Sequence, residues 1–152
     1  MKPPMSSRVP EAVDALVELA QAMKADGVVD DVFDGPTPMG ATKNHTAIAV
    51  FVTPEAAVVE QQPMSGWGTV YQEAFDVVCN IISWSGGDAV RPHREACLEI
   101  LDDLKTRLTA DPQLGGVCDR AYLGRRARWI PVNDDNGASV EVAFTVRVEA
   151  TV

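Results

Sequence analysis

The chain has 152 residues and a mass of 16.3 kDa, and 46% of its residues are hydrophobic, which is enough to build the core of one domain spanning 1–152. Its 13 Lys+Arg stand against 22 Asp+Glu, so the net charge is −9 and the sequence pI is about 4.6. This balance argues against general binding to nucleic acid or to an anionic membrane, because neutralising phosphate groups requires a positive surface.

The cysteine content and the N-terminus indicate the compartment. Cys79, Cys97 and Cys118 form an odd set without paired short spacings, unlike the disulfide framework of a small secreted domain, and this favours a reducing compartment. No apolar run approaches the roughly 20 residues that cross a bilayer, and the N-terminal MKPPMSSRVPEA lacks the apolar centre of a signal peptide. We therefore expect a soluble protein without a membrane partner that does not enter the secretory route.

The first periodic segment predicts an amphipathic helix over about 8–26. Its apolar residues recur at spacings of three and four, the pattern of a helix with one buried face. Ser6 or Ser7 is placed to cap the helix, Pro10 suits its first turn, and Gly27 supplies the stop.

Short strands are predicted next. The segment Val28–Phe33 predicts one strand, and the prolines and glycines of 34–40 then indicate a long loop. Alternating Ile, Val and Phe predict a second strand over Thr46–Thr53, and Ala57–Gln61 is a weaker candidate for a third.

The longest strand signal covers Tyr71–Trp84, where the odd-numbered residues form a mostly apolar face and the even-numbered residues a mixed one. The turn Ser85–Asp88 (SGGD) offers two glycines for positive φ and an aspartate to cap the following helix. That helix is predicted over about 89–109. Its apolar stripe consists of Val90, Cys97, Ile100, Leu101, Leu104 and Leu108.

The C-terminal part predicts more strands. The run Asp111–Gly116 (DPQLGG) ends the second helix, and Val117–Leu123 predicts a strand that Arg125–Val132 either extends or pairs with again. A turn at Asn133–Gly137 precedes the last strand, Ser139–Ala150, whose large apolar residues all occupy even positions. The element order predicts an α+β domain, a mainly antiparallel sheet with two helices packed on one face.

Catalytic and metal chemistry find little support. The chain has two histidines, His45 and His93, and neither stands in a recognisable catalytic motif. His93 and Cys97 are four positions apart on one helix face, so they could contribute to a metal site, and a small metal-dependent enzyme is the alternative of a different class. However, Cys97 lies within an apolar stripe, where a cysteine is usually a small buried hydrophobe. We therefore predict no catalytic residue, no metal and no cofactor.

The most unusual local feature is a group of basic residues in an acidic chain: Arg120, Arg125, Arg126 and Arg128 lie within nine positions, followed by Trp129. Arg and Trp are enriched where proteins bind each other. A site for an acidic protein surface and an edge strand protected by charge are equally compatible with this pattern.

Several motifs in a fixed order resemble the tail terminator family of long-tailed bacteriophages, the minor tail protein U type. They are VVDDVFDGPTP (Val28–Pro38), FDVVCNIISWSGGD (Phe75–Asp88), DPQLGGVCD (Asp111–Asp119) and the terminal strand SVEVAFTVRVEA (Ser139–Ala150). The resemblance runs from about Val9 to Ala150, and its most specific parts are the strand leading to SGGD and the DPQLGG run.

The resemblance implies a structural virion protein without enzymatic activity. Such a subunit forms a ring, typically of six, on the head-proximal end of the tail tube, where it ends elongation and offers a surface for head joining. Its implied partners are the tail tube protein and a head-tail connector or head-completion protein. The resemblance further implies that DNA passes through the central opening of the ring, its lumen, without specific binding. The expected location is the virion tail, and the host cytoplasm during assembly.

The residues that match the family motifs are mainly turn and capping residues, so the motifs do not identify the interface. We therefore choose interface candidates from long loops and from the exposed Arg and Trp residues. We expect contacts at Trp67, at the loop Gly35–Asn44, and at Arg120, Arg125, Arg126, Arg128 and Trp129. A neck or head-closure adaptor is the alternative function within the same class.

Overall fold

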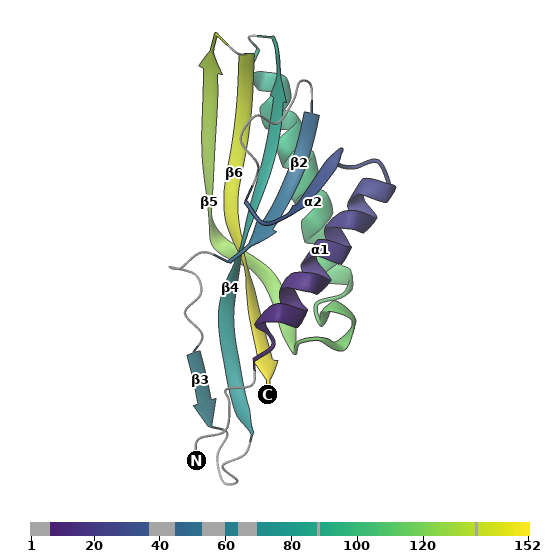
Figure 1. The fold of residues 1–152 in the computed structure, drawn as a ribbon, viewed down its shortest axis with the longest axis vertical. Coiled ribbons are helices and arrows are strands. Elements are labelled where there is room, and N and C mark those ends of the chain that lie inside the picture. The colour runs from purple at the N-terminus through teal and green to yellow at the C-terminus, as the bar shows by residue number, and fades with distance from the viewer. Residues whose placement is uncertain (1–6, 37–44, 53–59, 64–69, 88, 136) are drawn as a thin grey trace.

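The computed structural model describes residues 7–36, 45–52, 60–63, 70–87, 89–135 and 137–152 (Figure 1). In chain order its elements are α1 (Val9–Ala25), β1 (Asp31–Asp34), β2 (His45–Phe51), β3 (Glu60–Pro63), β4 (Tyr71–Ser85), α2 (Arg91–Ala110), the 3₁₀ turn η1 (Leu114–Gly116), β5 (Arg120–Asp134) and β6 (Gly137–Thr151).

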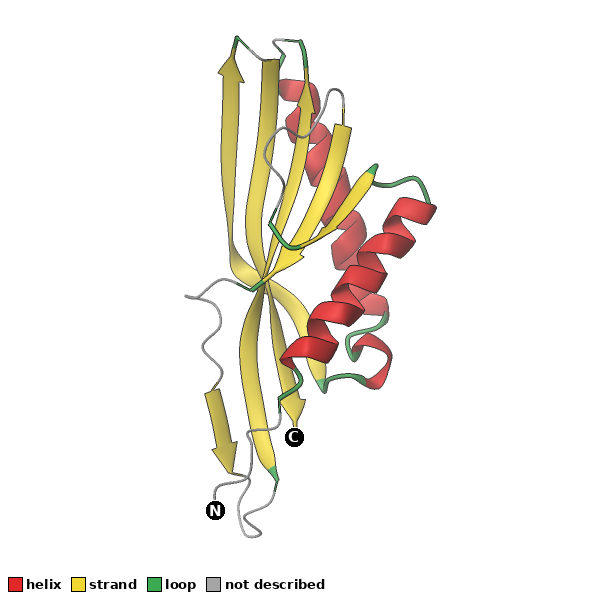
Figure 2. Cartoon of the chain, in the orientation of Figure 1, coloured by secondary structure: helices red, strands yellow, loops and turns green. Residues whose placement is uncertain are grey.

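The described strands form one six-stranded sheet in the order β1-β2-β4-β6-β5, and β3 pairs with the first part of β4. Only the β1–β2 pairing of this sheet is parallel. Both helices lie on the same side of the sheet (Figure 2). The predicted α+β class, a mainly antiparallel sheet with two helices on one face, is confirmed.

The core lies between the helices and one face of the two central strands, β4 and β6. From Glu73 to Ser83 the odd residues of β4 are buried, and from Ala138 to Ala150 the even residues of β6 are buried, so both predicted alternations are confirmed. These faces meet in register, with Val77 opposite Val146. The helices add a set of buried side chains: Ala12, Leu16, Ala20 and Met23 from α1, and Cys97, Ile100, Leu104 and Leu108 from α2.

The start of α1 differs from the prediction. Pro10 lies in the first turn as expected, but the cap position is held by Arg8 and no side chain caps the helix there. Ser7 contributes differently: its hydroxyl accepts a bond from the Val9 amide at 3.2 Å and donates to the Glu73 carboxylate at 2.6 Å. A strand residue therefore stabilises this helix start, which a local capping rule does not reveal.

Two predicted strands begin later than expected. The predicted strand Val28–Phe33 is observed only from Asp31, because the Val28 amide bonds the Met23 carbonyl at 2.9 Å and continues the wrap around the helix end. Gly27, at φ 77°, makes this wrap possible. Likewise the strand predicted from Val117 begins at Arg120, because residues 117–119 still belong to the turn that follows η1, where the Cys118 amide donates to the Gln113 carbonyl at 3.2 Å.

The SGGD turn is organised differently from the prediction. Neither Gly86 nor Gly87 has a positive φ, and Asp88, the predicted cap of α2, lies outside the described residues. The glycine that the geometry requires is Gly137, at φ 122°, where β6 begins. A Cβ at Gly137 would collide with the Ser85 carbonyl oxygen and lie 3.0 Å from Cα of Gly86.

Candidate functional site

The candidate site is built on a bulge in β5, an edge strand of the sheet. Leu123 faces Val146 of β6, and the next paired residue, Ala127, faces Phe144, so three residues of β5 oppose the single residue Thr145. Gly124 is the first of the three. A Cβ there would collide with the Thr145 hydroxyl and lie 3.3 Å from the Thr145 carbonyl oxygen, so glycine permits the close approach of the strands.

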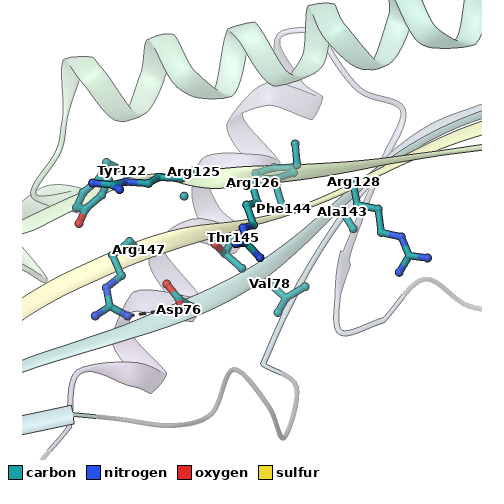
Figure 3. Close-up of a pocket in the computed structure, with 12 residues that line it drawn as sticks. Asp76, Val78, Tyr122, Arg125, Arg126, Arg128, Ala143, Phe144, Thr145 and Arg147 are labelled. Carbon is teal, nitrogen blue, oxygen red and sulfur yellow. Dashed lines mark ion pairs between the residues drawn. The ribbon is translucent and has the colours of Figure 1, made fainter.

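The bulge borders a hollow of about 990 Å³ on the sheet face that the helices leave open (Figure 3). The contributions of β4 and β6 come mainly from the alternate residues that point away from the helices. We call this hollow the arginine hollow, and its lining is Asp76, Val78, Tyr122, Gly124, Arg125, Arg126, Ala127, Arg128, Ala143, Phe144, Thr145 and Arg147.

The arginines around the hollow differ in how their charge is balanced. Arg147 lies 3.5 Å from the Asp76 carboxylate in the hollow wall. Arg125, Arg126 and Arg128 are exposed and form no ion pair within the described residues. The hollow therefore concentrates uncompensated positive charge in a chain whose net charge is −9.

Arg120 stands apart from this group. Its guanidinium lies 2.9 Å from the Glu149 carboxylate and 4.5 Å from the centre of the Tyr122 ring. The Glu149 charge raises the pKa of Arg120, and the charge of Arg120 is already balanced by that carboxylate. Arg120 therefore belongs to the flank of the hollow rather than to its lining.

Of the two tryptophans predicted as interface residues, only Trp129 lies within the described residues. Trp129 is 40% exposed, and its partner in the register is Val142, a residue of the buried face. It therefore lies on the opposite side of β5 from Arg128. Trp67 and most of the loop Gly35–Asn44 lie outside the described residues.

Arg147 is a lining residue that the sequence interpretation missed. It is separated from Arg125 by more than 20 positions, and its side chain reaches the hollow only because β6 pairs with both β4 and β5. Arg147 is an odd-numbered residue of the predicted strand Ser139–Ala150, whose even-numbered residues face the core. The alternation therefore places Arg147 on the opposite face, and this is the one indication in the sequence that it could line a site there.

The three cysteines are free and buried. Burial raises the pKa of the Cys79 and Cys97 thiols to about 12, so both are protonated at neutral pH and are poor nucleophiles. Among the described residues, no three His, Cys, Asp or Glu side chains are placed to hold a metal ion together. Nor does any described helix have the length and apolar character needed to cross a membrane.

His93 is held in the core by two hydroxyl groups. Its Nδ1 lies 2.8 Å from Oγ of Ser83, its Nε2 lies 2.9 Å from Oγ of Ser85, and only 8% of the residue is exposed. Both ring nitrogens are thus engaged by β4. Burial lowers the pKa of His93 below its ordinary value of 6.5 because the charged imidazolium loses hydration.

We expect this burial to make the fold less stable in acid. As the pH falls below about 6.5, His93 becomes protonated in the unfolded chain but stays neutral in the folded protein, because burial lowers its pKa there. The free energy of unfolding therefore decreases until the pH falls below the pKa of His93 in the folded protein. Urea unfolding at about pH 7.5 and about pH 5 measures the effect. The His93→Gln variant is the control, and an equal pH dependence in both proteins would contradict the expectation.

Comparison with known proteins adds no relative: no protein-family model matches the chain, and no curated protein matches it by sequence. The likeness to the tail terminator family rests on the motifs described above. The structure defines a single α+β domain with an edge strand whose positive, hollowed flank is suited to binding an acidic surface.

Proposed function

We propose that this protein is the tail terminator of a long-tailed bacteriophage, a subunit that assembles as a ring, typically of six, on the head-proximal end of the tail tube. The observation that carries the proposal is the order of the motifs, which spans nearly the whole chain. The α+β architecture is compatible with it, as is the presence of an edge strand with uncompensated arginines.

A terminator acts by geometry alone. A tube of stacked rings grows because each added ring leaves an open face for the next, a heterologous interface that does not close. A ring that fits the last tube ring below and offers a different face above ends this growth. The upper face then becomes the docking surface for a head-tail connector or head-completion protein.

The charge of the chain fits the passage of DNA through such a ring. Acidic side chains outnumber basic ones by 22 to 13, so a lumen of average composition would repel the phosphate backbone and not retain it. The proposal therefore places the arginines of the hollow at a protein contact and away from the lumen. The ring would act in the virion tail after assembly in the host cytoplasm.

Tail tubes mixed with the purified protein test the proposal. We expect electron micrographs to show extra density at one end of each tube, and we expect such tubes to stop growing when fresh tube protein is added. Tubes incubated with an unrelated acidic protein of similar size serve as the control. Continued elongation in the presence of the protein would contradict the proposal, and binding to connector rings without any effect on tube length would favour the neck adaptor.

A further inference from the structure

The helix side of the domain carries a charge pattern opposite to that of the arginine hollow. Glu11, Asp14 and Glu18 are exposed on α1 at spacings of three and four, so they form one row along the helix. We call this row the acidic ridge. The Arg8 guanidinium forms an ion pair with the Glu11 carboxylate at 2.6 Å. Asp14 and Glu18, in contrast, form no ion pair within the described part of the chain.

The acidic ridge is bordered by apolar surface. Beside Glu18 a shallow hollow of about 360 Å³ lies between α1, η1 and the end of α2, and its lining combines the apolar Ala15, Leu19 and Leu114 with the charged Arg107 and Asp111. A ridge of carboxylates next to apolar side chains offers both charge and contact area to a partner.

We infer that the arginine hollow binds the acidic ridge of a second copy of this chain. In one molecule the two surfaces cannot meet, because the hollow opens on the sheet face opposite the helices and α1 lies on the helix side (Figures 1 and 3). Between two copies the unpaired Arg125 and Arg126 would face the unpaired Asp14 and Glu18. Complementary charge of this kind orients partners and speeds their association.

The same charges exclude a symmetric dimer through the hollow. A two-fold contact would place arginines against arginines, because such an interface uses the same patch on both partners. Hollow to ridge is a heterologous contact, which leaves one free hollow and one free ridge and so adds further copies. That this contact joins neighbouring subunits of a ring rests on the proposed function. The charge complementarity of the arginine hollow and the acidic ridge rests only on the described side chains.

Charge exchange between the two surfaces tests this inference. One variant carries Arg125→Glu and Arg126→Glu, a second carries Asp14→Lys and Glu18→Lys, and a third combines all four changes. All four side chains are exposed, so folding should be preserved, which circular dichroism checks. Sedimentation velocity over a concentration series, at low and at high salt, measures self-association.

The matched control is Arg94→Glu with Lys105→Glu. These exposed cations lie on α2 and line neither the arginine hollow nor the hollow beside Glu18, and their reversal changes the net charge as much as the Arg125 and Arg126 pair does. The control therefore separates a surface-specific effect from a general effect of net charge.

We expect the wild-type chain to associate and salt to weaken this association. Each two-residue reversal should raise the dissociation constant roughly a hundredfold, while the combined variant and the equimolar mixture of the two reversed proteins should associate like the wild type. A wild-type chain that stays monomeric at the highest concentration in low salt overturns the inference. So does a reversal without effect beyond that of the control.

The combined variant decides what the hollow binds. If reversing the arginines has an effect but the four changes together do not restore association, the hollow binds a different surface of the second copy and the inference is wrong. Loss of binding to a short DNA duplex in the arginine variant alone would assign the hollow to nucleic acid and also overturn it. Failure of tube capping with successful charge exchange rejects only the proposed function, and capping with failed exchange rejects only this inference.

Discussion

Gly137→Ala is expected to lower the free energy of unfolding by about 3 kcal/mol or more, because two penalties coincide at this position. The residue has a φ of 122°, a conformation that L side chains rarely adopt. Its Cβ would also collide with the carbonyl oxygen of Ser85 at the end of β4. Neither penalty can be relieved by rotating a side chain, since the obstructing atom belongs to the backbone. Urea unfolding followed by circular dichroism measures the loss.

Gly86→Ala is the matched control for this substitution. Gly86 adjoins Ser85 and is exposed, has no positive φ, and has open space where a Cβ would lie. We expect its unfolding free energy to change by no more than about 0.5 kcal/mol. Equal stability of the Gly137→Ala protein and the control would mean that the junction of β4 and β6 tolerates a side chain and that the strands do not meet as described.

Glu73→Ala should lower the free energy of unfolding by about 3 kcal/mol, since it removes a buried charged acceptor and leaves three donors without it. Glu73 is fully buried on β4. Its carboxylate accepts bonds from the Ser7 hydroxyl at 2.6 Å, the Arg8 amide at 2.8 Å and the Gln61 side-chain amide at 3.2 Å. It also places a negative group at the positive end of α1. One side chain thus joins β4, β3 and the start of the first helix.

The effect of Glu73→Ala should be strongest at the start of α1. Amide hydrogen exchange is expected to accelerate in the first turn of α1 more than in α2, because only α1 loses a partner for its end. Gln72→Ala, an exposed change at the preceding residue of the same strand, is the control and should leave both helices unchanged. Uniform acceleration over the whole chain would show that Glu73 contributes global stability without fixing the helix end.

The sequence predicts the elements of this fold well where one face is buried. The alternation in β6 and in most of β4 assigns every buried residue correctly, because a slip of one position would turn the apolar side chains to the wrong face. Gly27 marks the end of α1 for an equally direct reason, its positive φ. The predicted strand Val28–Phe33 starts too early because Val28 and Val29 are apolar, and apolar character alone does not distinguish a strand from a buried turn.

The candidate site could be predicted only in part. Arg125, Arg126 and Arg128 are neighbours in sequence, so the sequence alone predicts their grouping. Arg147 and Asp76 join these arginines in the lining of the hollow only through the register of β6 with its two neighbours. The bulge that sets three residues of β5 against Thr145 cannot be recognised from hydrophobic periodicity. Glu73 is an odd-numbered residue of the predicted strand Tyr71–Trp84 and so falls on its mostly apolar face, but its role depends on Ser7 and Arg8, which are more than 60 positions away in the sequence.

The place of β6 in the sheet has a consequence for how the nascent chain folds. β6 is the last described strand in sequence, yet it lies between β4 and β5 and pairs along almost the whole length of β4. Until it emerges from the ribosome, β4 keeps an open edge along almost its whole length. Such contacts between distant segments close slowly, and open edges invite aggregation in the meantime. We therefore expect the central sheet to form only after β6 has been synthesised, so that no surface built on β5 and β6 is offered to a partner before then.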